Sequence, residues 1–141
     1  MSRRFRLTLL AAGAALALAT PAAAQQTVKR EPIKPISDIS GAASFKAYCT
    51  VCHGTSARGD GPAASVLKTP PADLTQIAKK NTGKFPALAV RATIIGDSAK
   101  PTHGTPDMPM WGSVFRSAEG DSTTALRLKN LVDYLETLQQ K

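Results

Sequence analysis

The chain has 141 residues, of which 18 are basic and 10 acidic, and its formal net charge is +8. A basic balance of this size is typical of proteins that meet a nucleic acid, a membrane surface or an acidic protein. Aromatic residues do not alternate with the basic ones, as a groove for single-stranded nucleic acid requires. Together with the signs of export described next, this leads us to expect no nucleic-acid partner.

Residues 1–24 have the layout of a secretory signal peptide. Three arginines precede an apolar stretch over residues 7–19, and the small residues Ala22 to Ala24 follow. The stretch is shorter than the roughly 20 residues that a membrane-spanning helix needs, although an uncleaved anchor is an alternative. We predict cleavage near Ala24 and a periplasmic protein, whose remaining 117 residues carry a formal charge of +5.

The mature chain is long enough for one small domain. We expect an extended leader over residues 25–37 and a single domain over residues 38–141. Aromatic residues make up only 5% of the chain, so its apolar core is thin for a domain of this size. The only two cysteines are three residues apart, and a disulfide between them would close almost no loop. Another component must therefore fill the core.

The first helix is predicted to start at a cap formed by Ser37 or Asp38 and to end near Tyr48. Its apolar residues recur at helical spacing. Gly41 is unusual inside a helix, where it costs about 1 kcal/mol relative to alanine. We therefore expect a second helix to approach closely at this glycine.

The segment Cys49–His53 has the pattern Cys-x-x-Cys-His, which indicates attachment of a c-type haem. On a helical turn, the sulfurs of Cys49 and Cys52 lie on one face and can alkylate two vinyl groups of a porphyrin, while His53 binds the iron. A thioredoxin-like dithiol is one alternative, but it needs a preceding strand. A zinc site that includes His103 is another, but Cys52 and His53 are adjacent and would crowd one metal ion.

The rest of the chain is predicted to form further helices separated by loops. The expected helical elements are a turn over residues 63–67, a brief helix from a cap at Asp73 through Ala78, a helix between Pro86 and Gly96, and a last helix from residue 121 or 122 to 139. A turn-rich loop is expected over residues 54–62 and a proline-rich loop over residues 97–110. No element is assigned to residues 111–120. The last helix carries a core-facing stripe of Leu128, Leu131, Leu135 and Leu138. No segment alternates as a strand would, so the fold class is all-α.

A second iron ligand is expected in the loop before the last helix. Haem iron in electron carriers is commonly held by His and Met, and Met108 and Met110 lie in this loop. We prefer Met108, because Pro109 stiffens the backbone beside it. Met110 and His103, which would give a site with two histidines, are the alternatives.

These residues together resemble a class I cytochrome c of the monohaem bacterial type. The resemblance extends over about residues 39–138. Gly41 and Phe45 match the glycine and aromatic residue of that family's first helix, and Leu131 and Tyr134 match the residues that cross them on its last helix. The resemblance implies a small all-α fold of three to five helices wrapped around one covalently bound haem c with its iron.

The resemblance also implies roles for individual residues. Pro62 of the Gly61-Pro62 pair would accept a hydrogen bond from Nδ1 of His53 through its carbonyl, which raises the basicity of the ligand. The Met-Pro-x-aromatic segment that ends at Trp111 would supply Met108 to the iron opposite His53 and place Trp111 in the haem pocket.

The function that follows is the transfer of single electrons between redox partner proteins, by a carrier rather than an enzyme. Exposed lysines could meet an acidic docking surface; the candidates are Lys46, Lys68, Lys79, Lys80, Lys84 and Lys100. The protein is expected to be a monomer or a subunit of a redox complex. Two alternatives stay open: a haem subunit of a larger oxidoreductase, and a peroxidase-like or small-ligand-binding protein if Met108 leaves the iron.

Overall fold

The computed structural model describes residues 34–97 and 108–140, which form helices and contain no strand. The helices are α1 (Gly41–Tyr48), α2 (Thr50–His53), the 3₁₀ turns η1 (Ala64–Val66) and η2 (Leu74–Gln76), α3 (Ile77–Lys80), α4 (Ala87–Ile95), α5 (Trp111–Glu119) and α6 (Asp121–Thr137). The predicted all-α class is confirmed, with six α-helices in the described residues where three to five were expected. The predicted signal peptide and His103 lie outside the described residues.

Helix α1 begins two or three residues later than the sequence predicts. The cap is Ser40, whose hydroxyl oxygen accepts a hydrogen bond from the amide of Ala43 at 3.3 Å. The carboxylate of Asp38 in turn accepts from the amide of Ser40 at 2.8 Å. Asp38 therefore stabilises the capping residue, and does not cap the helix itself. The prediction was wrong here because three polar residues in this stretch are suited to the same role.

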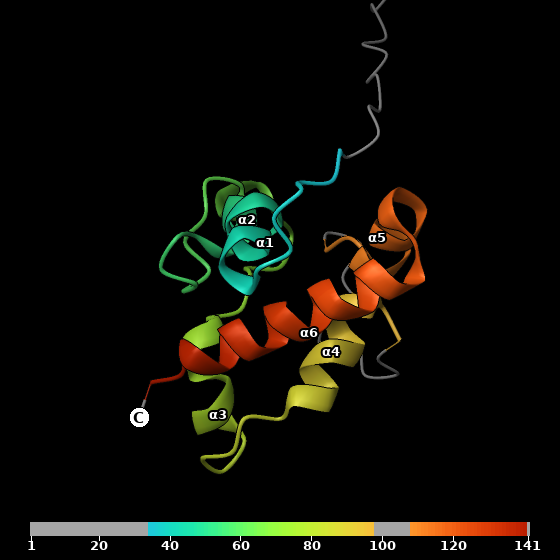
Figure 1. The fold of residues 1–141 in the computed structure, drawn as a ribbon. Helices are drawn as coiled ribbons and strands as arrows, with labels where there is room; N and C mark the ends of the chain where they lie inside the picture. The colour runs from blue at the N-terminus through green and yellow to red at the C-terminus, as the bar shows by residue number, and fades with distance from the viewer. Residues whose placement is uncertain (1–33, 98–107, 141) are drawn as a thin grey trace, which may run out of the picture. The chain divides into compact units, whose positions relative to one another are not determined.

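Helices α1 and α6 cross at Gly41, as predicted (Figure 1). A Cβ atom at Gly41 would lie 2.1 Å from the carbonyl oxygen of Asn130 and 2.5 Å from Cβ of Tyr134. One turn further, the rings of Phe45 and Tyr134 are 5.6 Å apart. Only a glycine lets the two backbones come this close, which offsets its low helix propensity.

The long helix α6 buries the leucine stripe that its periodicity predicts. Leu128, Leu131 and Leu135 are buried, and Leu138 is partly buried against the same core. Helices α1, α4 and α5 all pack against α6, which runs across the domain in Figure 1. The core therefore forms around this one helix.

The middle of the chain follows its local signals. The carboxylate of Asp73 accepts a hydrogen bond from the amide of Thr75 at 2.9 Å and caps η2 as predicted. Helix α4 lies between Pro86 and Gly96, also as predicted. Its buried residues, Ile94 and Ile95, face the core.

Helix α5 is the element that the sequence analysis missed. Trp111 and Phe115 are buried on it, and Val114 packs partly against the core. These positions follow helical spacing, so a signal was present within the unassigned stretch. Gly112 brings α5 close to α4, because a Cβ atom there would lie 2.8 Å from the side chain of Ile95.

The described residues belong to a compact unit that extends from Pro32 to Lys141. Residues 34–37 form neither helix nor strand, and hydrogen bonds attach this stretch to the helices. The amide of Ile36 donates to the hydroxyl of Tyr48 at 2.9 Å, and Asn130 donates to the carbonyl of Ile39 at 3.0 Å. No helix in residues 34–97 and 108–140 combines the length and apolar character needed to cross a membrane.

Candidate functional site

The segment Cys49–His53 forms a single helical turn directly after α1. The amides of Cys52 and His53 both donate to the carbonyl of Cys49, at 3.2 and 2.8 Å. Residues three apart on a helix lie on the same face, so the turn directs Cys49 and Cys52 to one side. This is the local geometry that attachment to one edge of a porphyrin requires.

Both cysteines are partly buried, and no disulfide joins them. Burial, with a smaller repulsion from Cys52, raises the pKa of Cys49 to about 12. The Cys49 side chain is therefore neutral at physiological pH, and its surroundings disfavour a thiolate. A thioether bond to a porphyrin is also uncharged, so this environment fits the attached form.

His53 is buried, with 8% of its surface exposed, and its Nδ1 atom lies 3.0 Å from the carbonyl oxygen of Ala72. A carbonyl oxygen can only accept, so Nδ1 carries the proton and donates. The tautomer is then the one whose Nε2 keeps a lone pair, which is the form that binds a metal. The hydrogen bond to Ala72 thus favours the tautomer of His53 that a metal ligand requires.

The carbonyl that holds His53 belongs to Ala72, whereas the resemblance predicted Pro62. The expectation for Pro62 is corrected on this point: Pro62 is exposed and lies beside a shallow hollow near the motif. Ala72 lies in an extended segment that starts with Pro70 and Pro71. A hydrogen bond from the amide of Leu74 to the carbonyl of Ala57, at 2.8 Å, holds the end of this segment in place, so the carbonyl of Ala72 reaches the imidazole. The consecutive prolines were a usable signal for this extended segment.

The loop that contains Pro62 is hydrogen-bonded to the backbone of the motif. The amide of Gly61 donates to the carbonyl of Cys52 at 3.1 Å, and that of Ala63 to the carbonyl of Val51 at 2.9 Å. A Cβ atom at Gly61 would lie 2.5 Å from the carbonyl oxygen of Val51. The glycine of the predicted Gly-Pro pair is thus needed for this close approach.

The two methionines have different surroundings. Met108 is partly buried and packs against the hydrophobic core. Met110 is 61% exposed, and its side chain lies over Gly96 at the end of α4. The next residue, Trp111, is buried at the start of α5, and its ring centroid is 5.3 Å from that of Tyr48. Since Tyr48 directly precedes Cys49, the structure brings the methionine segment next to the attachment motif.

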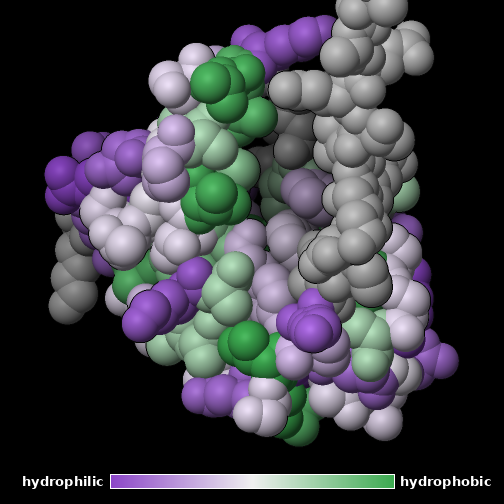
Figure 2. All heavy atoms as spheres, turned by 90° about the horizontal axis from the view of Figure 1, so that it is seen from above, coloured by the Kyte–Doolittle hydropathy of each residue, from purple (hydrophilic) through white to green (hydrophobic). Residues whose placement is uncertain are grey.

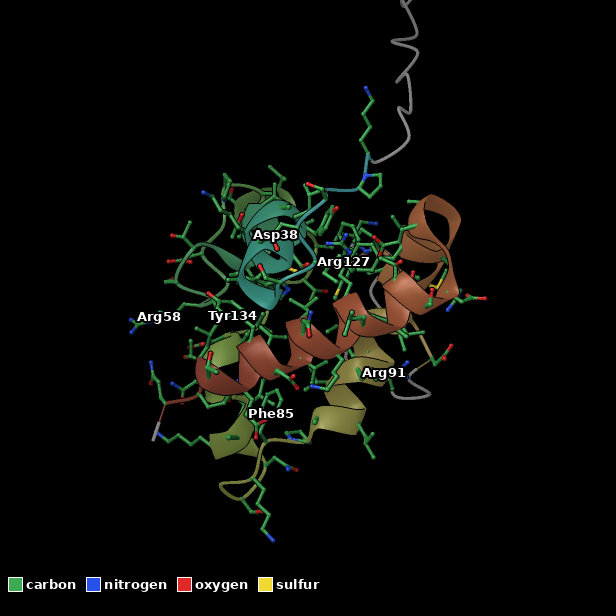
Figure 3. All side chains as sticks on the ribbon, viewed as in Figure 1. Asp38, Arg58, Phe85, Arg91, Arg127 and Tyr134 are labelled. Carbon is green, nitrogen blue, oxygen red and sulfur yellow. The ribbon has the colours of Figure 1, made fainter. Side chains whose placement is uncertain are left out.

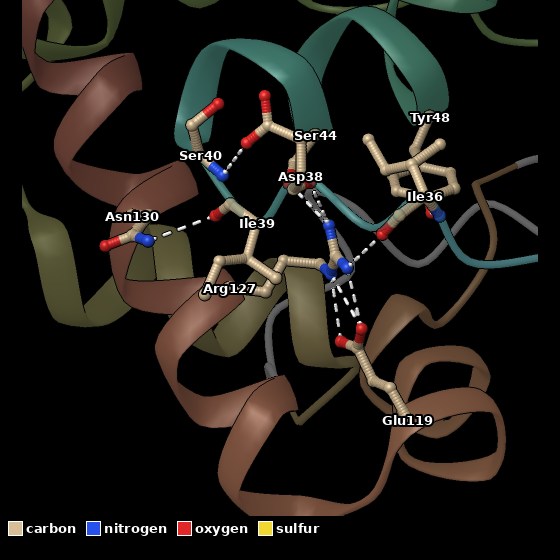
Figure 4. A network of polar contacts seen from close by, with 9 residues as sticks. All are labelled: Ile36, Asp38, Ile39, Ser40, Ser44, Tyr48, Glu119, Arg127 and Asn130. Atoms are coloured by element: carbon tan, nitrogen blue, oxygen red, sulfur yellow. Dashed lines mark hydrogen bonds and ion pairs between the residues drawn. The ribbon is translucent and has the colours of Figure 1, made fainter.

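A buried ion pair near these aromatic rings was not foreseen. Arg127 on α6 is 1% exposed and pairs with Glu119 at the end of α5, at 2.7 Å. The hydrogen bond to Glu119, which outweighs the opposing effect of burial, raises the pKa of Arg127. Figure 4 shows that the same guanidinium also reaches residues before and within α1. The available signal was a basic residue at 127 within the apolar stripe of α6.

The described residues fit a covalently bound haem. Two thiols and an oriented imidazole lie on one turn, and the aromatic residues beside them supply apolar surroundings. Figure 2 shows apolar side chains exposed on one face of the described residues. Within residues 34–97 and 108–140 no group of three or more His, Cys, Asp or Glu is placed to hold a metal ion.

The comparison with protein families decides between these possibilities. The model described as cytochrome c oxidase, cbb3-type, subunit III matches residues 38–135. The chain belongs to this cytochrome c family. No curated protein and no solved structure matches it significantly. The predicted resemblance to a monohaem class I cytochrome c is confirmed, and this cytochrome c carries covalently bound haem c with its iron and functions in haem-based electron transfer.

Proposed function

We propose that this cytochrome c is an exported, periplasmic electron carrier in which His53 and Met108 hold the haem iron. When bound, haem c supplies the one-electron change between ferric and ferrous iron. The observation that carries the proposal is the position of Met108, which packs against the core just before the buried Trp111. The layout of residues 1–24 supports export.

The protein's own groups would favour the reduced state. A neutral thioether opposite an imidazole stabilises ferrous iron, and apolar surroundings disfavour the additional charge of ferric iron. The hydrogen bond from His53 to Ala72 fixes the imidazole ring, so it does not have to reorient with each electron. A ligand set that stays in place is suited to a carrier and leaves no open position for a substrate.

Exposed basic residues in the middle of the chain support an acidic redox partner. Between Arg58 and Arg91 the chain has six basic residues and two acidic ones. The basic residues, all exposed, are Arg58, Lys68, Lys79, Lys80, Lys84 and Arg91. Figure 3 shows Arg58 extending away from the helices. Complementary charge would accelerate encounter with an acidic surface, and this acceleration would decrease with added salt.

A second candidate is a permanent haem subunit of a larger oxidoreductase. The description of the matching family names an oxidase subunit, which favours this candidate over a peroxidase-like protein. Both forms would use the same ligands and differ in their partner. Gel filtration of detergent extracts from the native cell, followed by haem staining, distinguishes a small free carrier from a large complex.

The test of the ligand set is a pair of redox titrations. Met108→Ala should keep the haem, because attachment depends on Cys49 and Cys52, and should lower the reduction potential through loss of the thioether. Met110→Ala is the matched control and should leave the potential unchanged. A drop for Met110→Ala alone would make Met110 the ligand. No drop for either variant, with a changed spectrum for His103→Ala, would indicate two histidine ligands.

A further inference from the structure

The guanidinium of Arg127 uses all of its hydrogen-bond donors. Nε donates to both oxygens of Glu119, at 2.9 and 3.1 Å, and one terminal nitrogen donates to the carbonyl of Asp38 at 2.9 Å and the hydroxyl of Ser44 at 3.1 Å. The other terminal nitrogen donates to the carbonyl of Ile36 at 2.8 Å and to Glu119 at 2.7 Å. A lysine has fewer donors and a single charged centre, so it could not make the same set of contacts.

These contacts connect segments that are far apart in the sequence. Asp38 precedes α1 and Ser44 lies within it, whereas Glu119 ends α5. The guanidinium carbon of Arg127 also lies 5.9 Å from the ring centroid of Tyr48 and 5.7 Å from that of Phe115. Arg127 thus contacts α1 and α5 at the same time, as Figure 4 shows for the polar contacts.

Helices α1 and α5 carry the two sides of the haem site. Helix α1 leads directly into Cys49, and α5 begins three residues after Met108. The rings of Tyr48 and Phe115, which Arg127 covers, are 5.1 Å apart, and Trp111 stacks on Phe115 at 5.5 Å. A substitution at Arg127 would therefore change the distance between α1, which leads to the cysteines, and α5, which follows Met108.

Stability alone does not account for a buried arginine at this position. Removing a charged pair from water costs free energy that its mutual attraction often does not recover, and apolar residues of similar volume are frequently as stable. A planar guanidinium that donates hydrogen bonds to the stretch before α1, to α1 and to the end of α5 does, however, fix the relative positions of these three segments.

We infer that Arg127 is a positioning residue that sets the spacing between the attachment side and the methionine side of the haem site, and so keeps Met108 on the iron. The inference rests on the proposed ligation by His53 and Met108.

The test uses the haem-loaded ferric protein and imidazole as an external ligand, followed by the haem absorption spectrum. Imidazole competes with Met108, so its apparent affinity increases with the fraction of molecules in which the methionine is off the iron. Arg127→Met should raise this affinity by about tenfold or more. Arg127→Lys keeps the positive charge but loses the planar set of guanidinium donors, so it should give an intermediate increase in imidazole affinity. It replaces Arg127→Met in the test if that variant does not fold.

Leu135→Ala is the matched control for general destabilisation. Leu135 is buried on the same helix, about 12 Å further along its axis. This variant should lose thermal stability without a change in imidazole affinity. An equal increase in affinity for Leu135→Ala at a matched loss of stability, or no increase for either Arg127 variant, would overturn the inference.

The wild-type spectrum separates this result from failure of the proposed ligation. Methionine-bound ferric haem has a characteristic red absorption band that Met108→Ala should abolish. If the band is present in wild type and lost in Met108→Ala, an unchanged imidazole affinity refutes the role of Arg127 alone. If Met108→Ala leaves the wild-type spectrum unchanged, the ligation itself is wrong, and the inference fails with it.

Discussion

The two sides of the haem site are built in different ways. On the attachment side, Cys49, Cys52 and His53 lie within five consecutive residues, and hydrogen bonds within one turn set their backbone geometry. On the methionine side, Met108 lies 55 residues after His53, and packing of α5 against α4 and α6 positions its segment. The first side depends on local structure and covalent bonds, whereas the second depends on the tertiary fold.

This difference predicts how each side responds to change. Substitutions on the attachment side should decide whether haem is present at all. Substitutions on the methionine side should leave the haem in place and alter its ligation. Contacts that join the sides, such as those of Arg127, are the ones through which a distant change could reach the iron.

The largest effect is expected for loss of the attachment cysteines. Cys49→Ala combined with Cys52→Ala should abolish covalent haem, because no thioether can form. Wild type should retain haem after acid–organic extraction, and mass spectrometry should find one haem added to a chain that begins near residue 25. Val51→Ala is the control, since Val51 lies between the cysteines and is 53% exposed. Covalent haem on the double variant would contradict the assignment.

The helix crossing should give the next largest effect. Gly41→Leu places side-chain atoms where the backbone of Asn130 and Cβ of Tyr134 now lie. We expect a loss of about 1–3 kcal/mol in the free energy of unfolding, the usual range for overpacking, measured by thermal denaturation of the haem-loaded protein. Ala42→Leu on the exposed face is the control. Equal stability of the two variants would show that the crossing does not depend on the glycine.

A smaller effect is expected at Asp73, next to the carbonyl that holds His53. The hydroxyl of Thr75 donates to Asp73 at 2.6 Å, and this bond, supported by the Thr75 amide against a smaller effect of burial, lowers the pKa of Asp73. The lowered pKa means that the stabilisation is complete above the unfolded value of about 4 and is lost as the pH falls through the folded value. Asp73→Ala should cost about 1 kcal/mol at neutral pH.

The pH dependence of Asp73→Ala sharpens this prediction. The stability difference between wild type and Asp73→Ala should begin to shrink below about pH 4 and should vanish as the pH falls through the lowered pKa at which the folded carboxylate is protonated. Chemical denaturation at a series of pH values measures it. A difference that stays constant from neutral to acidic pH would show that the ionised carboxylate does not cap η2.

The sequence allowed prediction of those parts that depend on short-range patterns. The attachment motif, the cap at Asp73 and the leucine stripe of α6 each follow from a few neighbouring residues, and Gly41 indicated the helix crossing. Ala72 and Arg127 could not be predicted in the same way. The first acts through a backbone carbonyl, which has no side-chain signature, and the second through contacts with residues more than 80 positions away.

Helix α5 is an intermediate case. Its apolar residues follow helical spacing, but the adjacent proline-rich loop and Gly120 obscured its limits. The resemblance also misplaced the partner of His53, because the extended segment that ends at Ala72 delivers its carbonyl to the imidazole, while Pro62 lies on the exposed loop outside the motif.

We propose above that Met108 binds the iron opposite His53. The most direct test is an NMR spectrum of the reduced, haem-loaded protein with ¹³C-labelled methionine methyl groups. One methyl resonance should be shifted far upfield by the porphyrin ring, should disappear in Met108→Leu and should remain in Met110→Leu. A spectrum of wild type without a shifted methionine signal, or a shifted signal that Met110→Leu removes and Met108→Leu retains, would contradict the proposal.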